Sequence, residues 1–255
     1  MMRKRILDKK RKVGMIIQAR MSSTRLPGKT LKKILGKPMI FRILERVKRC
    51  QKLDKIIVAI PKSKKDDILY DYLKSLKVNV FRGSENNLIK RFYMTAKKFN
   101  LKYIVRLPAD NPLPDWNEID RLIKFHLKKK DLNLFSSNLQ PLGRSKYIDG
   151  IGAEMFNIQM LEKLIKNPKL QKNKEHLTLN FFNIKNNKSV NSEHFNVGYP
   201  ISPKSIAYPK LVLDVNFKKQ YTFIEKIYEN LYVKNEKFNT RDVIKFLKKI
   251  KYKFT

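Results

Sequence analysis

Short apolar segments alternate with amphipathic ones along the first half of this 255-residue chain, and this alternation restricts the fold more than any other feature. Four short, mostly apolar segments have the length and composition of buried strands: 13–17, 55–60, 78–81 and 103–107. Three segments between them carry apolar residues at helical spacing: 39–47, 66–76 and 87–99. Strands that alternate with helices in this way predict an α/β fold with a mainly parallel sheet covered on both faces.

The second half of the chain is less regular. Helices are expected at 116–129, 158–166, 217–232 and 239–249, the last with Thr240 as its N-cap. Strand-like segments occur at 132–137, 150–156, 195–201 and 211–215. We therefore expect a single domain over residues 13–255, in which 136–214 forms an insertion or cap on the same sheet.

The charge of the chain is strongly positive but evenly spread. The chain has 58 Lys and Arg against 22 Asp and Glu, a formal net charge of +36. Lysines run from Lys4 to Lys253 and accompany many Asn and Ile residues, the composition that an AT-rich genome imposes. A solvated lysine coat explains this distribution better than a nucleic-acid footprint, so no specific nucleic-acid partner is expected. Residues 1–12 are interpreted as a flexible basic leader.

Composition also limits the cellular context. No apolar run approaches the ~20 residues of a membrane span, and the first residues lack the apolar centre of a secretion signal. The single cysteine, Cys50, forms no disulfide within the chain and is expected to pack inside an amphipathic helix. A cytoplasmic location is therefore expected.

The polar segment 18–29, directly after the first strand, concentrates chemistry in a short loop. It contains three cations, Arg20, Arg25 and Lys29, and three hydroxyl side chains. Such a loop at a strand end suits a polyphosphate, because Arg binds phosphate oxygens in pairs and Lys adds a compact charge. A P-loop is excluded because Ser23 stands where that motif needs glycine. An exposed basic turn is the alternative interpretation.

A second polar segment, 108–115, follows the fourth strand. Parallel sheets bind ligands at the carboxyl ends of their strands, so this segment and loop 18–29 are expected to face one cleft. Asp110 lies in this segment, and Asp214 lies at the end of the strand-like segment 211–215. As alternatives, Asp110 starts a turn and Asp214 caps the helix that follows.

The pattern Arg20-x-x-Ser23-x-Arg25-Leu26-Pro27-x-Lys29 after an Ile-Ile strand resembles the signature loop of sugar cytidylyltransferases. That group contains CMP-KDO synthetase, acylneuraminate cytidylyltransferase and the spore-coat polysaccharide cytidylyltransferase-like proteins, and the last branch is the most similar. The resemblance extends over about residues 13–230 through further matching segments: 35–39, 80–85, 105–113, 149–156, 175–178 and 213–214.

The resemblance implies a nucleotide-diphospho-sugar transferase fold with a dimerising, sugar-binding antiparallel excursion, and hence a homodimer. It implies transfer of CMP from CTP to a hydroxyl of a sugar, expected to be an acidic 2-keto-3-deoxy sugar for surface polysaccharide such as lipopolysaccharide. Arg20, Lys29 and Asp110 are the expected catalytic residues, and Asp110 and Asp214 the expected Mg²⁺ ligands. The expected CTP contacts are Gln18, Ala19, Arg20, Ser23, Arg25, Lys29, Arg82, Ser84 and Arg106. The expected sugar contacts are Glu154, Glu175 and His176.

Several of these residues also fit plainer roles. The segment around Arg82 and Ser84 fits a turn as well as a base or ribose contact, Glu154 fits an edge strand, and His176 fits a subunit interface. Two departures from the family pattern occur: Ala109 replaces the usual glycine before Asp110, and 215–218 differ from the usual residues after Asp214. Two other functions stay open, namely a nucleotidyltransferase joining another nucleoside triphosphate to a sugar 1-phosphate, and a non-catalytic basic binding module.

Overall fold

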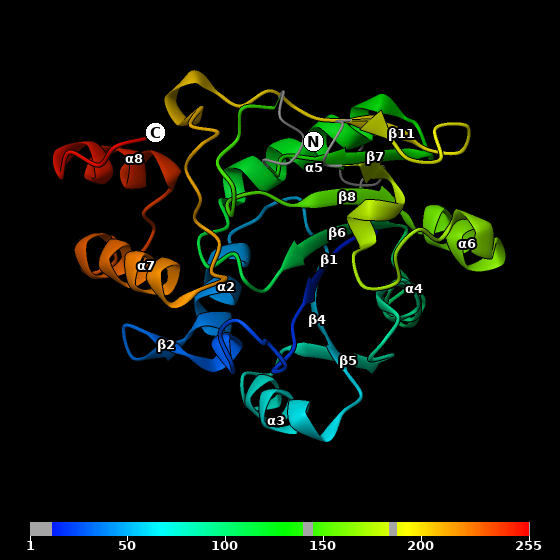
Figure 1. Cartoon of the computed structure of the whole chain (residues 1–255), viewed down its shortest axis with the longest axis horizontal. Helices are drawn as coiled ribbons and strands as arrows, with labels where there is room; N and C mark the ends of the chain where they lie inside the picture. Colours follow the sequence, from blue (N-terminus) through cyan, green and yellow to red (C-terminus); the bar gives the residue numbers. More distant parts are fainter. Residues whose placement is uncertain (1–11, 140–144, 184–187, 255) are drawn as a thin grey trace, which may run out of the picture.

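A seven-stranded sheet in the order β11-β7-β8-β6-β1-β4-β5 forms the centre of the computed structural model, which describes residues 12–139, 145–183 and 188–254 (Figure 1). Its strands are β1 (Val13–Gln18), β4 (Lys55–Pro61), β5 (Asn79–Gly83), β6 (Tyr103–Pro108), β7 (Leu134–Ser137), β8 (Glu154–Asn157) and β11 (Asn196–Gly198). β1 pairs in parallel with β4 and β6, and β4 pairs in parallel with β5. β8 runs antiparallel to both of its neighbours, β6 and β7.

Helices cover both faces of the sheet. They are α2 (Met39–Val47), α3 (Asp67–Ser75), α4 (Leu88–Lys98), α5 (Trp116–Lys129), α6 (Ile158–Lys166), α7 (Lys218–Leu231) and α8 (Thr240–Lys249). Figure 1 shows α4 and α6 on one side of the sheet and α2, α7 and α8 on the other. Met15 and Ile17 of β1 join the core under α2 and α7, while Ile16 joins the core under α4 and α6. This alternation is the period of two that a strand buried on both faces requires.

Shorter elements connect these layers. Two antiparallel pairs are β2 (Lys33–Ile34) with β3 (Lys37–Pro38), and β9 (Phe182–Asn183) with β10 (Lys188–Ser189). The 3-10 helices are η1 (Lys29–Leu31), η2 (Lys64–Asp66), η4 (Pro168–Leu170), η5 (Leu177–Asn180) and η6 (Lys204–Ile206). The model therefore confirms the predicted α/β fold with a mainly parallel sheet and small antiparallel parts.

Three local expectations were wrong. Residues 211–215 contribute an isolated bridge between Val212 and Asp149 rather than a strand of the sheet. Asn239, not Thr240, caps α8, because its side chain accepts hydrogen bonds from the backbone N–H groups of the first turn. The Thr240 hydroxyl instead donates to Asp115, at 2.6 Å. Cys50 lies beyond the end of α2 rather than inside a helix.

The segment 136–214 contributes β8 and β11 to the main sheet and ends beside the bridge at Val212. The basic leader predicted for residues 1–12 lies outside the described residues, apart from Lys12. Within the described part of the chain, no helix has the length and apolar character needed to cross a membrane.

Candidate functional site

A cavity of about 260 Å³ opens at the carboxyl ends of β1 and β6, where the sequence predicted a cleft. Sequence-predicted residues that line it are Gln18, Ala19, Arg20, Ser23, Arg25, Lys29, Arg106, Asp110, Glu175 and His176. Its other lining residues are Thr24, Thr30, Leu88, Arg91, Pro108 and Ala109. The structure thus brings together loop 18–29, called the basic loop below, the end of β6 and the segment around Glu175.

The basic loop is shaped by its own hydrogen bonds. The backbone N–H of Met21 donates to Asp66 Oδ1 at 2.7 Å, and the Thr30 hydroxyl donates to the backbone oxygen of Arg20 at 2.9 Å. The backbone N–H of Leu26 donates to Ser23 Oγ at 3.3 Å. Gly28 precedes η1 with φ +66°, a left-handed conformation that favours glycine. These contacts direct Lys29 toward the end of β6.

Lys29 lies at the junction of three segments. Its Nζ atom is 3.1 Å from Asp110 Oδ2 and donates to the backbone oxygen of Val215 at 2.7 Å. The Val215 N–H in turn donates to the backbone oxygen of Asp110 at 2.7 Å. Residues 214–215 therefore lie against the end of β6, although 211–215 form no strand of the sheet.

Asp214 is the second predicted acidic ligand, and it lies among other carboxylates. The pKa of Asp214 is raised to about 7, mainly by burial and also by the negative charges of Asp149 and Asp110, while the charges of Lys29 and Arg25 act in the opposite direction. Asp214 accepts hydrogen bonds from the side-chain amides of Asn216 and Gln220. Asp214 does not itself line the cavity, whereas Asp110, whose charge acts on it, does.

Asp149 begins the matching segment 149–156, for which the sequence predicted no metal or nucleotide contact at this residue. Burial and the charge of Asp110 raise its pKa. Gly150 follows it with φ +94°, and a Cβ there would lie 2.6 Å from the Asp214 backbone nitrogen. The Asp-Gly pair is therefore the signal that the chain passes close to Asp214 at this point.

Arg106 reaches the cavity from the middle of the sheet. Its Nε atom donates to Gln18 Oε1 at 2.8 Å, and its Nη1 atom forms an ion pair with Glu154 and donates to the Thr178 hydroxyl. Thr178 also donates to Glu154 Oε1, at 2.6 Å. Glu154 is 2% exposed and does not line the cavity, so in this structure it holds Arg106 rather than facing the space for the sugar.

The wall around Glu175 and His176 is built by a network of asparagine side chains. The backbone N–H groups of Glu175 and His176 both donate to Asn173 Oδ1, at 2.9 and 2.7 Å. The Leu88 N–H donates to the backbone oxygen of Lys174 at 2.7 Å, which fixes this segment to the start of α4. Two of the three predicted sugar contacts, Glu175 and His176, thus line the cavity.

Two predicted nucleotide contacts do not line this cavity. Arg82 forms an ion pair with Asp67 at 2.6 Å and donates to the backbone oxygen of Ser63 at 2.8 Å, and it lines a separate hollow. Ser84 accepts a hydrogen bond from the Asn87 N–H through its hydroxyl, and one from Arg91 Nη1 through its backbone oxygen. Ser84 is therefore connected to the cavity through Arg91.

Arg91 is a lining residue that sequence reasoning missed. It lies on the buried side of α4 among Leu88, Phe92 and Thr95. An arginine on the apolar face of an amphipathic helix is the available signal, since an unpaired cation is seldom placed there.

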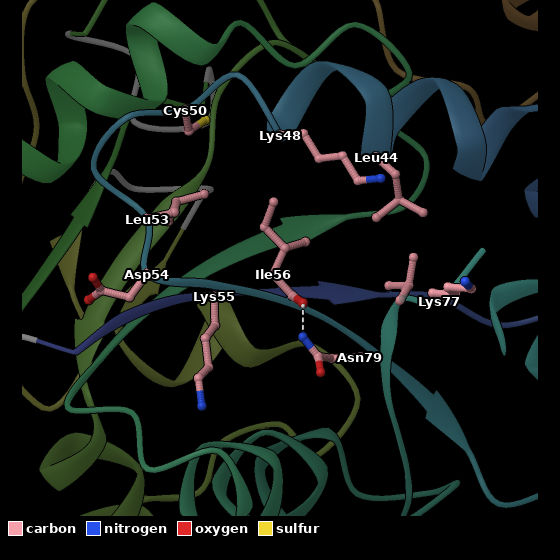
Figure 2. Close-up of a pocket in the computed structure, with 10 residues that line it drawn as sticks. Leu44, Lys48, Cys50, Leu53, Asp54, Lys55, Ile56, Lys77 and Asn79 are labelled. Atoms are coloured by element: carbon pink, nitrogen blue, oxygen red, sulfur yellow. Dashed lines mark hydrogen bonds between the residues drawn. The ribbon is translucent and has the colours of Figure 1, made fainter.

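A second cavity, of about 300 Å³, lies at the opposite edge of the sheet (Figure 2). It is lined by Lys55 and Ile56 at the start of β4 and by Asn79 at the start of β5, and Asn79 donates to the Ile56 backbone oxygen at 3.3 Å. Cys50 also lines it, and burial raises the pKa of that thiol, which keeps it protonated. Because α/β sheets bind ligands at the carboxyl ends of parallel strands, the cavity beside Lys29 is the better candidate.

Comparisons with known proteins show which family this chain resembles over its length. A family model described as cytidylyltransferase matches residues 15–250. An uncharacterized protein of Methanocaldococcus jannaschii, MJ1063, is 33% identical over 92% of this chain and 89% of its own length. The spore coat polysaccharide biosynthesis protein SpsF of Bacillus subtilis is 29% identical over 84% of this chain and 85% of its own length. The solved structure of a cytidylyltransferase from Leptospira borgpetersenii superimposes with a TM-score of 0.79 at 29% identity, covering 94% of this chain and 95% of that one.

Proposed function

This chain belongs to the cytidylyltransferase family, and we propose that it transfers CMP from CTP to a hydroxyl group of an acidic sugar, with release of pyrophosphate. The observation that carries the proposal is the contact between Lys29 and Asp110, which both line the cavity together with Arg20 and Arg25. This places cations and carboxylates together at the carboxyl edge of a parallel sheet.

The basic loop supports binding of the triphosphate. Arg20, Arg25 and Lys29 line the cavity together, and a triphosphate carries about four negative charges. Attack on the α-phosphorus builds negative charge on the leaving pyrophosphate, which positioned cations stabilise. The sugar hydroxyl is the nucleophile, so the chain needs no nucleophilic side chain of its own.

The acidic end of the cavity fits a magnesium ion. Asp110 and the neighbouring Asp214 offer carboxylate oxygens, and burial together with repulsion from Asp149 and Asp110 raises the pKa of Asp214, a repulsion that a cation would relieve. Among the described residues, no three His, Cys, Asp or Glu side chains form a complete metal site, so water and phosphate oxygens would supply the other ligands. We therefore propose that Asp110 and Asp214 hold Mg²⁺, which would neutralise charge on the phosphates.

The acceptor side of the proposal depends on Glu175, His176 and Arg106. His176 and Arg106 line the cavity, and both can donate hydrogen bonds to a carboxylate on the sugar. The name of the B. subtilis relative supports a role in polysaccharide biosynthesis. The acceptor class is proposed as a 2-keto-3-deoxy acid.

The test is a pyrophosphate-release assay on the purified chain with each of the four nucleoside triphosphates and a panel of 2-keto-3-deoxy acids. We expect activity with CTP and an acidic sugar, and a product in which one phosphate joins the nucleoside to the sugar. A product with two phosphates would instead identify the acceptor as a sugar 1-phosphate. Activity that persists in excess chelator would overturn the magnesium assignment.

A further inference from the structure

Arg91 is a buried cation that lines the cavity but is not satisfied by the protein. It is 6% exposed, and its Nη1 atom donates to the Ser84 backbone oxygen at 2.9 Å. Its Nε atom is buried and has no hydrogen-bond partner among the residues that the structure describes. Because a guanidinium has five N–H donors and leaving buried donors unpaired is costly, the remaining donors indicate a ligand.

The position of Arg91 separates it from the acidic end of the cavity. Asp110 follows β6 on one side of β1, whereas α4 follows β5 on the other side. Leu88 and Arg91 both line the cavity from the first turns of α4, and Leu88 is 4% exposed. This end of the cavity is thus lined by one apolar side chain, Leu88, next to the donors of Arg91, a combination that suits a planar base.

The charge around Arg91 also favours a neutral ligand group over a phosphate. The carboxylates of Asp66 and Glu85 already interact favourably with the Arg91 charge, while Arg20 opposes it. Burial lowers the pKa of Arg91 to about 10, so the group stays protonated at neutral pH. Arg91 therefore has anions nearby, while its Nε donor has no acceptor among the described residues.

We propose that Arg91 reads the base of the nucleotide and selects cytosine over uracil, an inference that rests on the proposed function. Cytosine presents two adjacent acceptors, O2 and N3, which match the paired donors of a guanidinium. Uracil presents an N3–H donor at the second position, and Arg has no acceptor to meet it. A site built for such hydrogen bonds discriminates strongly against an analogue that leaves them unpaired.

The test measures binding by calorimetry of CTP, UTP, cytidine and pyrophosphate to the wild-type chain and to Arg91→Met and Arg91→Lys. We expect Arg91→Met to weaken CTP and cytidine on the order of 10- to 100-fold, to leave pyrophosphate unchanged, and to reduce the CTP preference over UTP. Arg91→Lys retains the charge and most of the packing but loses the paired donors, so it should lose the same preference if Arg91→Met fails to fold. Lys90→Met, an exposed neighbour on α4, is the matched control and should bind as the wild type does.

The outcomes separate the two levels of inference. Wild-type protein that prefers CTP, with Arg91 variants that keep the same preference, overturns the role of Arg91 alone. Pyrophosphate binding weakened as much as CTP binding identifies Arg91 as a phosphate ligand and also overturns it. Wild-type protein that binds neither nucleotide overturns the proposed function itself.

Discussion

Lys29 Nζ lies 3.1 Å from Asp110 Oδ2, and this ion pair joins the loop after β1 to the end of β6. The Lys29 side chain is 13% exposed and that of Asp110 is 29% exposed, so both remain accessible from the cavity. The cation and the carboxylate are thus held together where a triphosphate and its metal would need them.

The Lys29→Ala variant should bind CTP more weakly, and its turnover should be lower by on the order of 10²-fold. The substitution removes a cation placed to stabilise the negative charge that develops on the leaving pyrophosphate. Steady-state kinetics checks this result. Lys33→Ala, an exposed lysine on β2, is the control and should leave kinetics unchanged. Wild-type kinetics in Lys29→Ala would remove Lys29 from the proposed site.

Magnesium should raise the melting temperature of the wild-type chain more than that of Asp110→Asn or Asp214→Asn. A ligand that binds the folded state stabilises it, and each variant removes a carboxylate charge from the proposed ligand set. Thermal melts with and without Mg²⁺ measure the shift independently of activity. An equal shift in wild type and both variants would contradict the assignment.

Glu154→Gln should destabilise the chain by about 3–5 kcal/mol, because it leaves the buried Arg106 guanidinium without its counter-charge. Urea unfolding provides the measurement. If Arg106 and Glu154 act as a pair, the double variant Arg106→Met with Glu154→Gln should lose less than the sum of the single variants. Normal stability with a raised KM for the sugar would restore Glu154 as a sugar contact.

The alternating apolar segments were sufficient to predict the fold because each strand of a sheet buried on both faces must be apolar along its length. The same pattern located loop 18–29 and Asp110 at neighbouring strand ends. The pattern did not predict the contact between Arg106 and Glu154. Their contact depends on the antiparallel register of β8 against β6, which pairs residues 48 positions apart.

The sequence pattern also failed to predict the role of Arg91 and the structure of residues 211–215. Arg91 carries no local signal except its place on an apolar helix face, and its partner Ser84 lies in the preceding loop. Leu211, Leu213 and Val215 pack in the core, although their segment forms only a bridge between Val212 and Asp149. Apolar composition reports burial, and here it did not distinguish a strand from a buried extended segment.

The contribution of His126 to stability should fall as the pH decreases from about 6.5 to about 4, because burial lowers the pKa of His126 to about 4. In this range the unfolded chain binds a proton at His126 that the folded chain does not, so this contribution to the free energy of unfolding rises with pH. Asp214, whose pKa is raised to about 7, contributes in the opposite direction, so the His126 contribution is the difference between the wild-type chain and His126→Phe. The contribution is about 3 kcal/mol, present above pH 6.5 and lost as the pH approaches 4. Urea unfolding between pH 4 and 7 measures it. His126→Phe should reduce this slope, and an unchanged slope would assign it to other groups.

Gly150→Ala should destabilise the chain by about 2–4 kcal/mol and displace Asp214, for two reasons that can be separated. Gly150 has φ +94°, and an added Cβ would meet the Asp214 backbone nitrogen at 2.6 Å. Gly36→Ala is the matched control, because Gly36 has φ +73° with no atom within 4 Å of the added Cβ. Gly36→Ala should therefore cost only the backbone strain, about 1 kcal/mol.

Thermal melts with and without Mg²⁺ compare the two variants. If only Gly150→Ala loses the Mg²⁺-induced shift in melting temperature, the close approach of residues 149–150 to Asp214 is supported as part of the proposed metal site. If both variants show the same shift and the same loss of stability, Gly150 serves only the turn.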